Sequence, residues 1–419
     1  MSRSSLLRDR GVRALVAAES ISVAGSQMTY IVLPWFVLTT TGSPARTSVV
    51  LAAEMAPVAL FGLASGSVTA RIGARSTLLV CDAARAGLLA LIPTLYLADA
   101  LSFPLLVGLV FLVGVFMVPH ATAQRVIVPE LVGEDEARVG ETQSLLQAAL
   151  AVAGVVGPAL GGVLIGVLGE TNVLYIDAAT YAVSFLLVAG WVRPHHTAPD
   201  ESDEPRGVIA GVKFLFADSL LRVWMLSITG MNVVWTAMGV LFPVLVLERY
   251  GDRPEILGWI FGAFGAGAVI GSVGSFRLIG GVDRLLVSAV AAMVQATALW
   301  VLLPDLAWPI VSAAAFVAGL FVPFLNAVVV TMRTMRTPPR LRASVHTAAV
   351  TVALILAPVG ALVAGPALSV YSLEVVLAGA LAAYTFVCMT FAAAGLRERA
   401  LVPPEAAPVS AGPGGPRGP

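Results

Sequence analysis

The sequence is short of charge: only 12% of its 419 residues are Asp, Glu, Lys or Arg. A water-soluble domain carries about 25% charged residues, so this chain cannot cover a soluble surface. Hydrophobic residues make up 58% of it, and the mean hydropathy is +0.91. Its 25 basic and 25 acidic groups cancel, and without a basic excess we expect no nucleic-acid partner. The composition predicts a polytopic membrane protein with short loops.

Cysteine is also scarce: the chain has two, Cys81 and Cys388, each in or beside an apolar stretch. This excludes a disulfide framework and a cysteine-rich metal cluster. A membrane enzyme would need a nucleophile with a base, or a metal motif. The sequence has no H-E-x-x-H, and His120 and His346 stand alone in it. We therefore expect no enzyme, no metal and no cofactor.

What the sequence has instead is a series of apolar segments bounded by charges or turn residues. Each is close to the ~20 residues needed to cross a bilayer. Because backbone groups in hydrocarbon must be satisfied within the segment, each is predicted to be a helix. The fold class is therefore an all-α membrane protein with twelve transmembrane helices, at about 14–40, 47–69, 78–98, 103–124, 143–168, 172–192, 220–247, 256–276, 285–303, 308–330, 345–368 and 373–395.

A hydrophilic interval after the sixth segment divides the chain into two halves. Similar features recur six segments apart, in the loops 66–75 and 274–284 and in the segments containing 157–162 and 358–366. Such a repeat predicts two pseudo-symmetric six-helix bundles in parallel orientation. The predicted division is an N-terminal segment 1–13, a first bundle 14–192, a central loop 193–219, a second bundle 220–395 and a disordered tail 396–419, rich in Pro and Gly near its end.

The basic residues predict the orientation, because cytoplasmic loops hold the excess of Lys and Arg. With the N-terminus inside, 22 of the 25 basic residues fall on the cytoplasmic side, Arg71, Arg75 and Arg85 among them, and the outer loops keep only Arg46, Arg249 and Arg253. We expect a multi-pass protein of the plasma (inner) membrane with both termini and the central loop in the cytoplasm.

The fifth segment carries the most informative motif, a run of glycines around a proline: Gly154, Gly157, Pro158, Gly161 and Gly162. Small residues on one helix face let a neighbouring helix approach closely, and the proline removes a backbone hydrogen bond. The run resembles the GxxxGPxxGG signature on the fifth helix of antiporters and exporters of the major facilitator superfamily. The alternative is a glycine-rich packing face in an unrelated helix bundle.

The loop after the second segment is similar to a second motif of that superfamily, at Gly66, Arg71, Gly73 and Arg75, followed by Asp82 and Arg85 at the start of the third segment. The resemblance implies a charged latch that holds the cytoplasmic side closed in the outward-facing state. Ala70 stands where relatives carry an acid, which puts the usual network in question. The alternative is that these arginines only determine the topology.

Most of the chain, about residues 10–396, resembles the macrolide-efflux and siderophore-exporter branch of the superfamily. The similar stretches are 13–26, Leu33-Pro34-Trp35, 41–44, 128–132 and 211–216. This resemblance implies a secondary active exporter, an antiporter of the multidrug-resistance kind, that moves a hydrophobic antibiotic, another natural product or a siderophore by alternating access. The fourth segment lacks the buried arginine common in drug exporters, its nearest arginine being Arg125. An importer of a small metabolite remains the alternative.

Three acids within apolar segments are candidates for carrying protons: Glu54 first, then Glu19 and Asp177. An acid at the centre of a bilayer costs about 2.5–3.5 kcal/mol on insertion scales, so such residues are candidates for function. For Glu19 a pair with Arg13 or a loop arginine is the alternative. For Asp177 we favour an interfacial cap near the outer end of its segment.

Polar and aromatic residues at helical spacing predict a central pathway for the substrate. The candidates are Ser22, Ser26, Tyr30, Gln143, Gln147, Asn232, Trp235 and Asn326. An apolar, aromatic lining with a few amides suits a bulky amphipathic ligand. We expect a monomer whose partners are the lipid bilayer, a small-molecule substrate and protons, with the proton gradient as its energy source.

Overall fold

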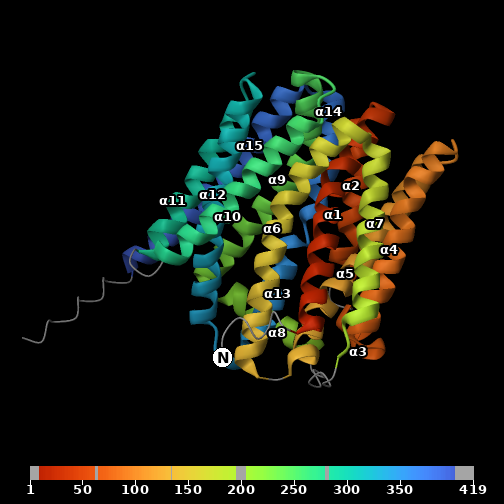
Figure 1. Cartoon of the computed structure of the whole chain (residues 1–419). Helices are drawn as coiled ribbons and strands as arrows, with labels where there is room; N and C mark the ends of the chain where they lie inside the picture. Colours follow the sequence, from red (N-terminus) through yellow and green to blue (C-terminus); the bar gives the residue numbers. More distant parts are fainter. Residues whose placement is uncertain (1–8, 62–64, 134, 195–203, 279–282, 402–419) are drawn as a thin grey trace, which may run out of the picture.

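The computed structural model describes residues 9–61, 65–133, 135–194, 204–278 and 283–401. Within these ranges every regular element is helical (Figure 1). The first half contains α1 Arg10–Thr41, α2 Pro44–Phe61, α3 Ser65–Ile72, α4 Ala74–Leu97, α5 Phe103–Val132, α6 Glu136–Leu168 and α7 Glu170–Trp191. After α8 Glu204–Ala217, the second half contains α9 Ser219–Tyr250, α10 Glu255–Leu278, α11 Arg284–Leu299, η2 Trp300–Leu302, α12 Trp308–Arg336, η3 Pro339–Leu341, α13 Arg342–Leu354, α14 Ala357–Val370 and α15 Leu373–Leu401.

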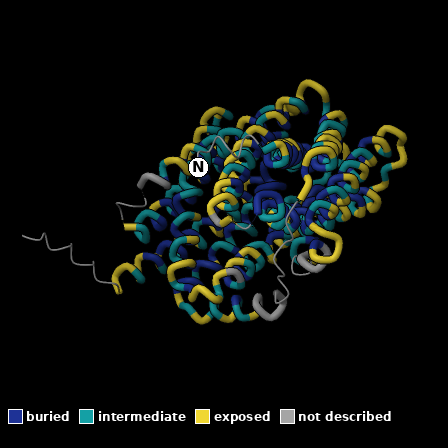
Figure 2. The backbone as a smooth tube through the Cα atoms, turned by 60° about the horizontal axis from the view of Figure 1, so that its bottom comes forward, coloured by how far each residue is buried: buried dark blue, intermediate teal, exposed yellow. Residues whose placement is uncertain are grey.

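Within the described residues, eleven stretches of helix are long and apolar enough to cross a membrane, and α13 and α14 together make one of them. The remaining span is α2, whose 18 residues include the charged Arg46 and Glu54. The predicted fold class, an all-α membrane protein with twelve spans, is confirmed. The exposed positions form the rim of the bundle and the buried ones its interior (Figure 2). Large apolar side chains such as Leu186 and Phe386 are exposed, as a surface facing lipid requires.

The structure departs from the expected loops in three places. A short helix, α3, lies in the loop after the second span, and α8 lies within the expected central loop 193–219. The last helix, α15, continues to Leu401, so the expected tail 396–419 begins as helix. The rest of that tail, 402–419, and the segments 1–8 and 195–203 lie outside the described residues.

Four helices begin with the same device, an aspartate at the N-cap. Asp9, Asp135, Asp218 and Asp283 each accept hydrogen bonds from two backbone N–H groups of the first turn, in α1, α6, α9 and α11. These N–H groups have no partner within the helix, so a capping oxygen stabilises the start of each helix. All four caps lie at the end of the molecule where α1 begins, called here the lower end after its place in Figure 1.

Two of these caps, Asp218 and Asp283, also tie helix ends together by ion pairs, and the partner of Asp283 is Arg399 of α15 at 2.5 Å. Asp218 binds Arg336 of α12 at 2.8 Å, and Arg336 also binds Glu398 of α15. Burial by itself would raise the pKa of Asp218, but hydrogen bonds from the Leu221 N–H and from Arg336 outweigh it, so the pKa is lowered. The carboxylate therefore stays ionised and holds the lower ends of α9, α12 and α15 together at neutral pH.

The two halves meet mainly at the upper end of the bundle. There α6 packs on α10 and α2 packs on α14 (Figure 1). Gly162 of α6 lies directly against the backbone of Gly258, and a Cβ built on Gly365 of α14 would lie 2.5 Å from the Cβ of Ser48. These contacts close the upper end and depend on residues without large side chains.

Candidate functional site

A network of polar side chains lies buried within the first half, between α1, α4, α5 and α7. Its ionisable members are all less than a tenth exposed: Glu19, Asp82, Arg85, His120 and Asp177. Burying charge is costly unless the groups are paired or hydrogen-bonded. A cluster of this kind in a membrane span is therefore the first candidate for the functional site.

One part of the network joins three helices around His120. Its Nε2 lies 3.2 Å from Oδ1 of Asp82 on α4 and 3.7 Å from Oε1 of Glu19 on α1. Gln124 follows one turn later on α5, on the same face as His120, and donates a hydrogen bond to Oε2 of Glu19. Ser184 of α7 donates to Oδ2 of Asp82 at 2.7 Å. Glu19 is thus held by α5, and not by Arg13 or a loop arginine as the alternative supposed.

The second part of the network is built on Arg85, one turn after Asp82 on α4. Its guanidinium carbon lies 4.0 Å from the centre of the Tyr181 ring, and Nη2 donates to the Tyr181 hydroxyl and, at 3.4 Å, to Ser26. Ser26 and Tyr181 share a hydrogen bond of 2.5 Å. Among the described residues no carboxylate lies within ion-pair distance of Arg85. Its positive charge therefore rests on an aromatic face and two hydroxyls.

Asp177 lies deep in the network, and the expected interfacial cap is wrong. The carboxylate is completely buried and accepts hydrogen bonds from Thr29 of α1 at 2.5 Å and from Thr180 at 3.0 Å. Gly25 of α1 faces the same carboxylate so closely that a Cβ would collide with Asp177 and Thr180. The glycine thus allows α1 and α7 to meet around a fully buried acid.

Glu54, the first candidate for a proton carrier, is set apart from this network on α2. It is half-buried, and its Oε2 is buried with no hydrogen-bond partner among the described residues. The backbone of Glu54 packs against Gly114 of α5. The structure therefore brings Glu19 together with Asp82 and His120, and leaves Glu54 outside these contacts, within electrostatic reach of Arg85 and Asp177.

The loop motif after the second span does not form the expected latch in this structure. Arg75 donates from Nε to the carbonyl of Val192 at 2.6 Å and from Nη2 to that of Ala189 at 2.7 Å, which caps the end of α7. Asp82 and Arg85 lie about two and three turns further along α4, because a turn takes 3.6 residues. They face the buried network and cannot join Arg71 and Arg75 at the helix start.

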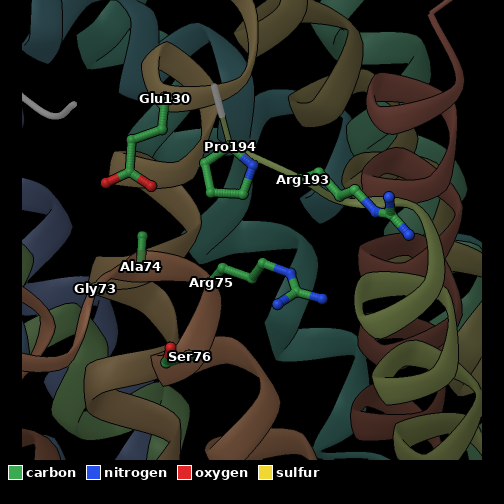
Figure 3. Close-up of a pocket in the computed structure, with 7 residues that line it drawn as sticks. All are labelled: Gly73, Ala74, Arg75, Ser76, Glu130, Arg193 and Pro194. Atoms are coloured by element: carbon green, nitrogen blue, oxygen red, sulfur yellow. The ribbon is translucent and has the colours of Figure 1, made fainter. Parts of the chain in front are cut away.

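The same loop borders a pocket of about 380 Å³ at the lower end, lined by Gly73, Ala74, Arg75, Ser76, Glu130, Arg193 and Pro194 (Figure 3). Gly73 has φ +81°, a conformation that favours glycine. In Figure 3 the Arg193 guanidinium points away from the Glu130 carboxylate. Arg71 is exposed, and the surroundings of Gly66 lie outside what the structure describes.

The glycine motif of α6 faces two helices. A Cβ on Gly157 would lie 2.5 Å from the carbonyl oxygen of Ala24 on α1, and one on Gly161 would lie 3.0 Å from the Cα of Met28. Gly162 faces α10 of the other half, and Gly154 has room, with its nearest neighbour at 3.9 Å. Pro158 lies within the helix between these contacts. This motif places α6 between α1 and the second half.

The residues expected to line a substrate pathway differ in burial and in the helices that they contact. Ser22 is buried, while Ser26 belongs to the Arg85 network. Two aromatic candidates contact α10: the Tyr30 ring lies 6.1 Å from that of Phe261, and Trp235 lies 4.7 Å from Phe264. The amides are half-buried or exposed. They are Gln143 and Asn232, both half-buried, and Gln147 and Asn326, both exposed.

His120, Tyr181 and Ser184 are not among the site residues predicted from the sequence, and Arg85 was predicted to lie on the cytoplasmic side. Two spacings in the sequence point to Arg85 and His120 as buried polar residues. Asp82 and Arg85 are three residues apart within an apolar run, and His120 and Gln124 are four apart within another; both spacings put side chains on one helix face. The spacing along one helix does not show which other helices pack against that face, because this depends on the tertiary structure.

The chain is similar to known proteins both in sequence and in fold. The family model described as Major Facilitator Superfamily matches residues 15–361. The "Multidrug efflux pump Tap" of Mycobacterium tuberculosis is 29% identical over 382 residues, covering 85% of this chain and 87% of the relative. Tap of Mycolicibacterium fortuitum is 27% identical over 370 residues, covering 85% and 89%. The crystal structure of the nucleoside transporter NupG matches with a TM-score of 0.71 at 13% identity, covering 91% of this chain and 98% of that one, a likeness in fold alone.

Proposed function

From the premise that the chain belongs to the Major Facilitator Superfamily, we propose that it is an exporter of hydrophobic or amphipathic small molecules, such as antibiotics, other natural products or siderophores. Membership makes it a multi-pass membrane transporter and not an enzyme. One observation carries the proposed direction: relatives named multidrug efflux pumps match along 85% of the chain. The fold does not choose a direction, so import of a small metabolite is the second candidate.

The proposed mechanism is alternating access driven by inward movement of protons. The buried carboxylates of the first half support it, with Glu54, Glu19 and Asp177 as candidate carriers. Exchange requires only that proton and substrate favour opposite states of the transporter. No cofactor enters this scheme, and the transporter works as a monomer with lipid, substrate and protons as its partners.

The export proposal predicts resistance in a bacterial host that lacks its own drug pumps. Expression of the chain should raise the inhibitory concentration of some amphipathic antibiotics about fourfold or more, and should lower the steady-state accumulation of ethidium. A protonophore should restore accumulation, because it removes the gradient. Higher accumulation of the tested compounds on expression would instead support import, and unchanged accumulation in the presence of the folded protein would contradict the proposal for those compounds.

The proposed orientation places the lower end of the bundle, with both termini, in the cytoplasm of a cell whose plasma membrane holds the protein. Arg46, in the first turn of α2, and Arg138, in the first turn of α6, are both exposed and lie at opposite ends. In intact cells a membrane-impermeant maleimide should label Arg46→Cys and spare Arg138→Cys. The native Cys81 and Cys388 are buried, so the background is low. Labelling in the opposite pattern would reverse the orientation.

A further inference from the structure

Three buried polar atoms from three helices converge in the first half without being satisfied. They are Nε2 of His120, Oε1 of Glu19 and Oδ1 of Asp82, and none makes a well-directed hydrogen bond to a described residue. The side chains of both acids are fully buried, and that of His120 is 8% exposed. Leaving such groups unsatisfied costs free energy, so the arrangement favours a species that binds all three.

A proton is the species that fits this arrangement. The distances of 3.2 Å to Asp82 and 3.7 Å to Glu19 leave no room for a larger ligand between the groups. The second oxygens of the acids are occupied by Ser184 and Gln124, so the free oxygens both face the imidazole. With the imidazole neutral the three groups carry two negative charges, and one added proton brings this to one.

The other charged and titratable groups around His120 do not take its place as the partner of Glu19 and Asp82. Arg85 on α4 is held by Tyr181 and Ser26 and is not paired with either acid. Asp177 of α7 is hydrogen-bonded to two threonines, and Arg71 of α3 is exposed. The remaining titratable groups are Cys81, which is buried on α4, and Glu54 on α2. No described cation thus neutralises Glu19 and Asp82 directly.

We propose that His120, Glu19 and Asp82 together form the proton-binding site of this transporter, with the imidazole of His120 accepting the transported proton between the two carboxylates. The proposal rests on the proposed proton-driven export and deepens it. A proton from water on one side binds the neutral imidazole to give the imidazolium, and deprotonation to water on the other side restores it. One proton is taken up and one is released in each cycle, so no other reactant is needed.

The position of Glu19 connects this site to the contact between the halves. Glu19 lies on α1, which packs along α6 through Gly157 and Gly161. The next residue of that motif, Gly162, meets Gly258 of the second half. A change of charge at His120 alters the attraction between α1, α4 and α5, and α1 is the helix that supports α6 at the interface between the halves.

The test uses purified protein in proteoliposomes with ethidium as the probe. Two rates are measured: uptake driven by a pH gradient, and exchange of ethidium at equal pH, which needs no net proton movement. His120→Asn should lower driven uptake at least tenfold and leave exchange within about twofold. His346→Asn is the matched control, because His346 lies in the second half beside Arg333, and it should leave both rates unchanged.

The outcomes separate this inference from the proposed function. If the wild type shows no driven uptake, the proton-driven export of ethidium fails. If the wild type shows it and His120→Asn retains it, the proton site at His120 is overturned and the proposed function stands. Loss of driven uptake in Glu54→Gln with full retention in His120→Asn would move the site to Glu54.

A second measurement needs neither transport nor a tolerated variant at His120. The chain has four histidines, and ¹⁵N-histidine spectra of the wild type in nanodiscs can be followed from pH 5 to 9. Ordinary histidines titrate within this range, so the ring of His120 is recognised by its response: one titration midpoint should move in both Glu19→Gln and Asp82→Asn, by about one pH unit or more, while the other midpoints stay in place. If no histidine responds to either substitution, the three groups do not share a proton and the inference is wrong.

Discussion

Replacing Gly162 by Leu is expected to prevent the closure of the upper end and so to reduce transport at least tenfold. The residue lies directly against the backbone of Gly258, where no side chain fits. Overpacking costs about 1–3 kcal/mol, occasionally more, and about 1.4 kcal/mol is a tenfold change in an equilibrium constant. The substitution should therefore shift the population toward the state in which α6 and α10 are apart.

The shift can be measured directly at the second contact between the halves. Ser48 is completely buried against α14, so a cysteine there should react with an impermeant maleimide only when the upper end opens. Ser48→Cys should be labelled at least tenfold faster in the Gly162→Leu background. Gly140→Leu is the matched control, because on the same helix it meets nothing within 4 Å. Equal labelling in both backgrounds would show that this contact does not control opening.

Arg85→Gln is expected to abolish transport and to lower the yield of folded protein. The guanidinium is the cation that lies within the acidic network, stacked on Tyr181 and bonded to its hydroxyl. Removing one member of a buried charged network costs about 3–5 kcal/mol, which is more than a hundredfold in rate if it falls on the transport step. Ethidium transport per folded molecule, with yield from fluorescence size exclusion, measures both effects.

Two further variants test whether the effect of Arg85→Gln is specific to the buried guanidinium. Arg85→Lys keeps the charge but cannot cover a ring and donate in a fork as arginine does, so it should retain folding and only part of the transport. Arg46→Gln removes an exposed arginine that lies 5.3 Å from the Phe103 ring and should change neither quantity. Full transport in Arg85→Gln would mean that the acids of the first half need no internal cation.

The fold was largely predictable because hydrocarbon imposes strict conditions on a chain. Apolar length and the need for internal hydrogen bonds made the spans visible in the sequence. The helices α3 and α8 were missed because a short helix without a long apolar run carries no such signal. The expected loops around them were inferred only from polarity, which does not distinguish a loop from an amphipathic surface helix.

The site was predictable only as far as single residues stand out. Glu19 and Asp177 were found because an acid within an apolar run is conspicuous. Arg85 was misplaced because a basic residue near the start of a span looks like a topology signal until its partner Tyr181, on another helix, is known. His120 was read as isolated for the same reason, since Glu19 and Asp82 are close to it only in the folded protein.

The buried ionisable groups described above gather in the first half, whereas the second half meets it through aromatic rings and glycines. If the chain is the exporter proposed above, substitutions at Trp235 or at Phe264, which it contacts, are expected to alter which compounds are accepted and to leave the charged groups of the first half intact. Selection would then diversify one half and constrain the other, and exchanging second halves between relatives is expected to change substrate preference without changing the proposed coupling to protons.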